Sequence, residues 1–196
     1  MKETIIKSYK ESIHVKETFF KQTMAPVIQA AEIIADAFKA GNKLLICGNG
    51  GSAADSQHLA AEFVNRFVIE RPPLPAVALS TDTSVITSIG NDYSFEQIFS
   101  KQIKAIGKEG DVLLAISTSG DSKNVIMAAK VARDMGIKII GLTGKGGGKM
   151  AKMVDILLNV DSDVTARIQE VHITVGHIIC ELVDHIIFQS MGKEQE

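Results

Sequence analysis

Short apolar runs alternate along this chain with longer segments that carry apolar residues at helical spacing. Parallel strands need a helix-length crossover between them, so this alternation predicts a parallel sheet covered by helices. The expected strands are residues 43–47, 76–79, 112–116, 138–142 and 156–160. The predicted fold class is therefore α/β, a three-layer sandwich with a five-stranded parallel sheet flanked by helices.

The segments between and around these runs predict the helices. In the sheet-forming part, helices are expected at residues 52–67, 83–89, 95–106, 122–134 and 164–191. Two further helical segments, residues 1–22 and 25–40, precede the first strand and are expected to separate near Thr23-Met24-Ala25-Pro26. The first of them is too polar in stretches to be a core element by itself. We therefore expect the N-terminal helices to lie at a subunit interface.

Composition and charge set the broad class of protein. The 196 residues are 45% hydrophobic, which predicts a single domain over 1–196, with an N-terminal helical segment (1–40) and an α/β core (41–196). A formal net charge of -2 without a basic run argues against binding to nucleic acid or to an anionic membrane. Cys47 and Cys180 are isolated, which predicts buried thiols rather than a disulfide.

The N-terminus shows no secretory signal pattern. No apolar run is expected to reach transmembrane length. Both observations predict a cytoplasmic protein whose partners are small molecules or other proteins.

The segment from Asp111 to Asn124 places hydroxyl side chains directly after a predicted strand. The strand is expected to end at Ile116, and the turn that follows (residues 117–122, the hydroxyl turn) contains Ser117, Thr118, Ser119 and Ser122. These hydroxyls, the backbone N–H groups and the start of a helix near Ser122 could bind a phosphate without an arginine. Such residues also cap helices, but one cap accounts for one hydroxyl and not for the whole group.

A second turn, Gly48-Asn49-Gly50-Gly51 (the glycine turn), joins the first predicted strand to the next helix. It formally fits the dinucleotide-binding pattern, which also needs an acidic residue about 20 positions later, at a strand end. Glu70 falls instead in a polar stretch, and residues 144–149 do not form a nucleoside-triphosphate loop. Both turns follow strands of one parallel sheet, which favours a single small anionic ligand, with Ser52 contributing from the first turn.

A polar stripe on the helix after the glycine turn carries the expected chemistry. It consists of Asp55, His58, Glu62 and Arg66. His58 and Glu62 could bind one metal ion or act as an acid/base pair, and the alternative is a solvated helix face with a Glu–Arg ion pair. The last helix adds Gln169 and His177 on one stripe, although a core helix can carry such groups as a satisfied polar spot.

Together these motifs resemble the phosphoheptose isomerases of the sugar isomerase (SIS) family, over essentially the whole chain. The matching segments are Cys47-Gly-Asn-Gly-Gly-Ser52, His58 with Glu62, Gly90-Asn91-Asp92, the stretch from Gly110 to Gly120, Leu142-Thr-Gly144 and Arg167-Ile-Gln-Glu-Val-His-Ile173. The two turns alone would indicate only the wider family. His58 and Glu62 together with Gln169 and His177 narrow it to the phosphoheptose isomerases.

The resemblance implies a flavodoxin-like SIS fold and a homotetramer. It also implies one Zn2+ ion per subunit, held by His58, Glu62, Gln169 and His177. Glu62 and His177 are the implied catalytic residues. The residues implied for sugar-phosphate binding are Asn49, Gly50, Gly51, Ser52, Arg66, Asn91, Asp92, Ser117, Thr118, Ser119, Ser122 and Gln169.

The implied reaction interconverts sedoheptulose 7-phosphate and D-glycero-D-manno-heptose 7-phosphate through an enediol, in heptose biosynthesis for lipopolysaccharide or other glycans. Glu62 would act as the base at carbon, His177 as acid and base at the oxygens, and zinc as a Lewis acid. A zinc-bound carboxylate is a poorer base, so whether Glu62 binds the metal, carries the proton or does both stays open.

Two other classes of function remain as alternatives. One is a non-catalytic SIS scaffold that binds the replication initiator protein, as a relative of the phosphoheptose isomerases does. The other is a sugar-phosphate sensor without turnover. The presence of both Glu62 and His177 favours the enzyme.

Overall fold

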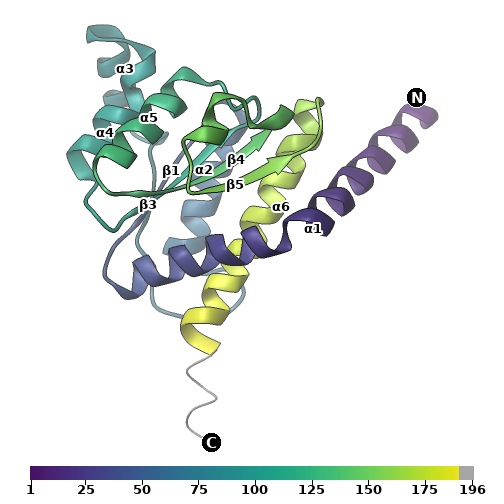
Figure 1. Cartoon of the computed structure of the whole chain (residues 1–196), viewed down its shortest axis with the longest axis horizontal. Helices are drawn as coiled ribbons and strands as arrows, with labels where there is room; N and C mark the ends of the chain where they lie inside the picture. The colour runs from purple at the N-terminus through teal and green to yellow at the C-terminus, as the bar shows by residue number, and fades with distance from the viewer. Residues whose placement is uncertain (190–196) are drawn as a thin grey trace, which may run out of the picture.

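The computed structural model describes residues 1–189, and its centre is a five-stranded parallel sheet (Figure 1). The strand order is β2-β1-β3-β4-β5. The strands are β1 (Leu44–Cys47), β2 (Ala76–Ala78), β3 (Val112–Ser117), β4 (Lys138–Gly144) and β5 (Ile156–Val160). Helices pack on both faces of the sheet, which confirms the predicted α/β three-layer sandwich.

The place of each strand in the sheet explains its apolar pattern. Every residue of β1 and β3 is buried, because these central strands are paired on both edges and covered on both faces. The edge strands β2 and β5 alternate buried with more exposed residues. β3 and β4 run past their predicted ends because Ser117 still pairs with Thr143 in the parallel register. Ser117 is therefore both the last residue of β3 and the first residue of the hydroxyl turn.

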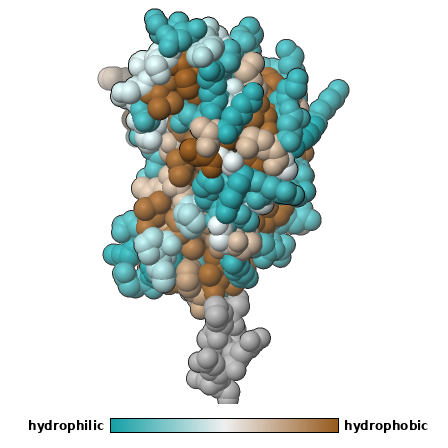
Figure 2. Space-filling model, turned by 90° about the vertical axis from the view of Figure 1, so that its left-hand side faces the viewer, coloured by the Kyte–Doolittle hydropathy of each residue, from teal (hydrophilic) through white to brown (hydrophobic). Residues whose placement is uncertain are grey.

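Two helical layers enclose two separate hydrophobic clusters. One layer consists of α1 (Lys2–Lys39), α2 (Gly51–Val64) and α6 (Thr165–Asp184). The other consists of α4 (Ile98–Ile106) and α5 (Lys123–Asp134). On the side of the molecule that carries α3 (Thr83–Asp92) and α4, hydrophobic and hydrophilic side chains are interspersed (Figure 2), as expected for helices that bury one face.

The N-terminal region is one continuous helix, so the prediction of two separate helices was wrong. Pro26 lies inside α1, where its missing N–H removes only one backbone hydrogen bond. Phe19 and Val27 lie on either side of the expected break and are buried in the same cluster. Burying two such side chains offsets the cost of about 3 kcal/mol for an internal proline. The first turns of α1 extend away from the rest of the molecule (Figure 1).

Other helix boundaries also differ from the predicted ones. α2 ends at Val64 rather than at residue 67, because Asn65 leaves the helical conformation, so Arg66 lies beyond the helix that carries His58 and Glu62. α3 (Thr83–Asp92) continues past residue 89, and the segment 95–106 divides into the 3-10 turn η1 (Phe95–Gln97) and α4. A glycine-rich 3-10 segment, η2 (Lys145–Lys152), precedes β5. The last helix, α6, is followed by a π-helical turn, η3 (His185–Gln189), and its predicted end at residue 191 lies outside the described residues.

The last helix also corrects the expectation about transmembrane length. The segment Thr165–Phe188 is long and apolar enough to cross a membrane by length and composition alone. About half of this segment is nevertheless buried inside the protein, where Ile168, Val175 and Ile179 belong to the hydrophobic core. Core packing therefore accounts for the hydrophobicity of this helix.

Candidate active site

The glycine turn and the hydroxyl turn lie side by side at the carboxyl ends of β1 and β3. β1 and β3 are neighbours in the sheet, and the chain leaves β1 toward one face and β3 toward the other, which makes this a topological switch point. Asn49 and Asn124 join the two turns by a reciprocal pair of amide hydrogen bonds, of 2.9 and 2.8 Å. Asn49 was predicted to bind substrate; Asn124 was missed, although it lies just past the hydroxyl turn.

The hydroxyl turn gathers three of its predicted side chains. The Ser117 Oγ lies 2.9 Å from the Ser122 Oγ and 3.4 Å from the Ser119 Oγ. Ser122 is the N-cap residue of α5, but within the described residues its side chain makes no capping bond to that helix. The simple capping alternative therefore does not explain Ser122, and the first N–H groups of α5 face the turn. Gly120 has φ +67°, a conformation that other residues rarely adopt.

The glycine turn starts α2 and packs against α6. Gly50 has φ +55° and precedes the first residue of α2, Gly51. A Cβ at Gly51 would overlap the side-chain amide of Gln169, so glycine here lets α6 approach the turn closely. Ser52 follows in the first turn of α2 and is buried. The structure thus brings Gln169 to the glycine turn.

Two histidines and a glutamate converge between α2 and α6. The Nε2 atoms of His58 and His177 are 2.8 Å apart, so one ring donates its proton to the other. The His58 Nε2 also lies 3.4 Å from the Glu62 Oε1. Phe67 stacks on the His177 ring at a centroid distance of 5.5 Å. Sequence reasoning missed Phe67, because its spacing on the helix assigns it to the apolar side.

Asp55 interacts electrostatically with both histidines and also contacts Gln169. The Gln169 Nε2 lies 3.4 Å from each Asp55 carboxylate oxygen. Burial raises the pKa of the Asp55 carboxyl, and the Gln169 hydrogen bond and the charges of His58 and His177 oppose that rise. Asp55 was part of the predicted polar stripe but was not among the predicted site residues.

His172 fixes the same helix to the sheet. Its Nε2 lies 3.0 Å from the Thr143 carbonyl oxygen at the end of β4, and its ring is buried. Burial lowers the pKa of His172 to about 4, against a weaker opposing effect of that hydrogen bond. His172 is therefore a neutral anchor for α6 at neutral pH.

The fit of a metal ion depends on the two histidines. Within residues 1–189, no group of three or more His, Cys, Asp or Glu side chains is arranged as a ready metal centre. Nitrogen ligands of one tetrahedral zinc lie about 3.3 Å apart, so His58 and His177 at 2.8 Å need only a small outward movement. Glu62, which lies beside His58, supplies an oxygen donor. Gln169 contacts Asp55, whose carboxylate interacts electrostatically with both histidines. This donor set is compatible with zinc.

Three predicted site residues lie apart from this cluster. Arg66 pairs with Glu70 at 3.5 Å rather than with Glu62, so the expected Glu–Arg alternative for the α2 face is not what the structure shows. Asn91 and Asp92 bond to each other at 2.8 Å at the exposed end of α3. In the part of the chain that is described, no hydrogen bond joins any of the three to the histidines or the hydroxyl turn.

Comparison with known proteins identifies the family of the chain. The SIS domain family model matches residues 8–144. The phosphoheptose isomerase of Nitratidesulfovibrio vulgaris Hildenborough is 56% identical over 187 residues, which cover 95% of this chain and 90% of that protein. The phosphoheptose isomerase of Thermodesulfovibrio yellowstonii is 53% identical over 189 residues, 96% of this chain and 94% of that protein.

Solved structures give the same result. The phosphoheptose isomerase of Neisseria gonorrhoeae superposes with a TM-score of 0.89 at 48% identity, over 93% of this chain and 98% of that chain. The Francisella tularensis phosphoheptose isomerase superposes with a TM-score of 0.91 at 42% identity, over 93% of this chain and 97% of that chain. The chain is an isomerase enzyme of the SIS-domain family and belongs, within that family, to the phosphoheptose isomerases.

Proposed function

We propose that this sugar-phosphate isomerase interconverts sedoheptulose 7-phosphate and D-glycero-D-manno-heptose 7-phosphate. The observation that carries the proposal is the convergence of His58, Glu62 and His177 between two helices that both contact the glycine turn. A ketose becomes an aldose by proton transfers between neighbouring carbons and oxygens, and these side chains are the kinds of acid and base that such transfers need.

The proton transfers can be assigned to two side chains. Glu62 removes a proton from C1 of the ketose and returns it to C2 of the enediol. His177 donates a proton to O2 and accepts one from O1 of the enediol. Phe67 keeps the His177 ring in one orientation by stacking on it.

The phosphate of the substrate belongs at the hydroxyl turn. Ser117, Ser119 and Ser122 present clustered hydroxyls, with Thr118 in the same turn, and the start of α5 adds backbone N–H groups. Ser52 lies at the start of α2 on the adjacent turn. This arrangement would fix the phosphate end, so that the other end of the sugar chain reaches Glu62 and His177.

The proposed cofactor is one Zn2+ ion per subunit, held by His58, Glu62, Gln169 and His177. When bound, it would supply Lewis-acid stabilisation of negative charge on a sugar oxygen. A carboxylate that binds a metal is a weaker base, so Glu62 would serve the proton transfer best when it is not bound to the metal.

We also propose the assembly and the cellular setting. The projecting part of α1 exposes Ile5, Tyr9 and Ile13, which supports packing of these helices in a homotetramer. Arg66, Asn91 and Asp92 would then approach a sugar held by a neighbouring subunit. The chain would act as one cytoplasmic domain over residues 1–196 and feed heptose to lipopolysaccharide or another glycan. Light scattering on the purified protein tests the tetramer.

Turnover of sedoheptulose 7-phosphate by the purified protein tests the function. Glu62→Gln and His177→Gln should each lower kcat by at least about a hundredfold, because each removes a general acid or base. Glu109→Gln is the matched control, since Glu109 is an exposed carboxylate in the loop before β3, at the opposite end of that strand. Near-normal turnover in either site variant would remove its assignment. The scaffold alternative is not favoured, and it would return only if the wild-type protein were inactive with metal present.

A further inference from the structure

A buried ion pair links the segment after α2 to the end of α6. The Arg71 Nε donates to the Asp184 Oδ1 at 2.8 Å, and the two side chains are only 1% and 4% exposed. Removing two charges from water is costly, and an apolar pair of similar volume is often at least as stable. A gain in stability is therefore a weak explanation for the buried Arg71–Asp184 ion pair.

The rest of the Arg71 guanidinium binds the end of α2. The Nη2 donates to the carbonyl oxygen of Glu62 at 2.9 Å, and the Nη1 donates to that of Phe63 at 2.6 Å. The last carbonyls of a helix lack partners within the helix, and a positive charge there also complements the helix dipole. Arg71 thus holds the peptide group of the proposed catalytic base itself.

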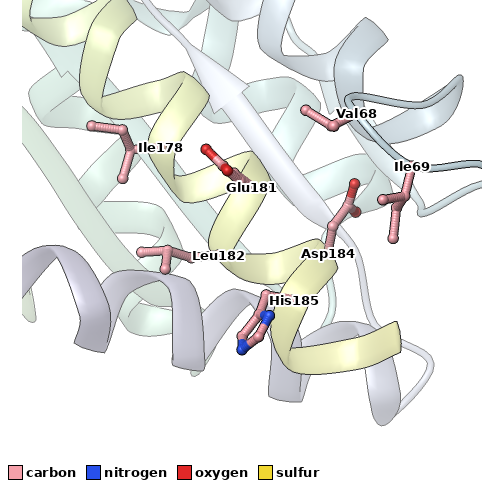
Figure 3. A pocket seen from close by; sticks show the side chains of 7 residues that line it. All are labelled: Val68, Ile69, Ile178, Glu181, Leu182, Asp184 and His185. Atoms are coloured by element: carbon pink, nitrogen blue, oxygen red, sulfur yellow. The ribbon is translucent and has the colours of Figure 1, made fainter. Parts of the chain in front are cut away.

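Asp184 provides the opposite anchor on the helix that carries His177. The two residues are seven positions apart, which is about two helical turns, so they share one face of α6. Figure 3 shows Asp184 pointing from α6 toward the segment that carries Val68 and Ile69, beside a cavity of about 350 Å³. Among the described residues, the second carboxylate oxygen of Asp184 has no hydrogen-bond partner. The hydrogen-bond partner of the Asp184 carboxylate is therefore Arg71.

A second contact between the helices lies directly beside the histidines in the chain. Gly176 faces Leu59, and a Cβ at Gly176 would lie 2.7 Å from the Leu59 methyl carbons. This contact sets how closely α2 and α6 approach. The Arg71–Asp184 pair sets how far α2 can slide or turn along α6, because it holds the last turn of α2.

We propose that Arg71 and Asp184 are positioning residues that hold Glu62 in register with His58 and His177. The inference rests on the roles proposed for Glu62 and His177, and it adds the residues that keep their two helices aligned. Arg71 touches neither the hydroxyl turn nor the proposed phosphate position, so its effect belongs to the chemical step rather than to phosphate binding.

Arg71→Lys tests the proposal, because lysine keeps the charge but lacks the planar fork that reaches Asp184 and the two carbonyls together. We expect kcat for sedoheptulose 7-phosphate to fall by about tenfold or more, since small displacements of catalytic groups are that costly, while KM stays unchanged. Asp184→Asn, which keeps the side-chain shape, should act in the same direction. The histidine NMR signals of His58 and His177 should shift in both variants.

Asp111→Asn is the matched control. Asp111 is a fully buried carboxylate that pairs with Lys43 at 2.6 Å before β3, away from both site helices. An equal loss of thermal stability in this control, with normal kcat and unshifted histidine signals, would support the positioning role. Normal kcat in Arg71→Lys, with Glu62→Gln inactive, would overturn it. If wild type did not turn over the substrate, the proposed reaction would fail, and the histidine signals alone would decide whether Arg71 positions this cluster.

Discussion

Replacing Gly176 by alanine should push α2 and α6 apart at the point where His58 meets His177. The new Cβ would lie 2.7 Å from both Leu59 methyl carbons. Carbon atoms in contact prefer about 3.5–4.0 Å, so the helices must separate by roughly 1 Å, or Leu59 must change rotamer. Leu59 is 1% exposed, which leaves its side chain little room to move.

Gly176→Ala should lower both the free energy of unfolding and kcat. Overpacking a core contact costs about 1–3 kcal/mol of unfolding free energy, and the better helix propensity of alanine returns at most about 1 kcal/mol. A displacement of about 1 Å between groups that act together lowers kcat by about a hundredfold. His58 precedes Leu59 in the chain and would move with it.

Turnover assays and urea unfolding midpoints of three variants measure both effects. Gly176→Ala should lose both activity and stability. Adding Leu59→Ala should restore much of kcat while lowering stability further, because it makes room for the new methyl but leaves a cavity. Gly90→Ala is the stability control, since it also lies in a helix but its Cβ would meet nothing within 4 Å. Normal kcat in Gly176→Ala, or no rescue by Leu59→Ala, would refute the reasoning.

Three further predictions address pH, the hydroxyl turn and the metal. Burial lowers the pKa of His172 in the folded protein to about 4, so as pH falls His172 takes up a proton in the unfolded chain before it does so in the folded protein. The free energy of unfolding should therefore drop by about 2 kcal/mol between pH 7 and 5. Urea midpoints of wild type and His172→Gln should show this loss only in wild type. Gly120→Ala should raise KM and lower stability, since φ is +67° and its Cβ would overlap the Gly147 carbonyl; steady-state kinetics and a phosphate titration check this. Chelator treatment should abolish turnover and shift the His58 and His177 NMR signals, and added zinc should reverse both; full turnover after chelation contradicts the metal proposal.

Local patterns in the sequence were sufficient for the sheet and for the two turns. The run before Ser117 is apolar throughout because β3 is buried on both faces. A strand covered on both faces has no alternation of polar and apolar residues, so a short continuous apolar run was enough to predict it. The family could be recognised from the two turns together with His58, Glu62, Gln169 and His177, and the matching relatives confirm the family. Local propensity failed at Pro26, where burial on both sides of the proline keeps α1 continuous.

The sequence by itself therefore determined which segments form the strands, and that His58 and Glu62 share one face of a helix. Only the tertiary structure decided which side chains meet: Asn49 with Asn124, Phe67 with His177, and Arg71 with Asp184. The physical reason is that periodicity fixes the direction of a side chain relative to its own helix or strand. Its partner depends on strand order and on how closely two helices pack, and both are set by contacts between segments far apart in the chain.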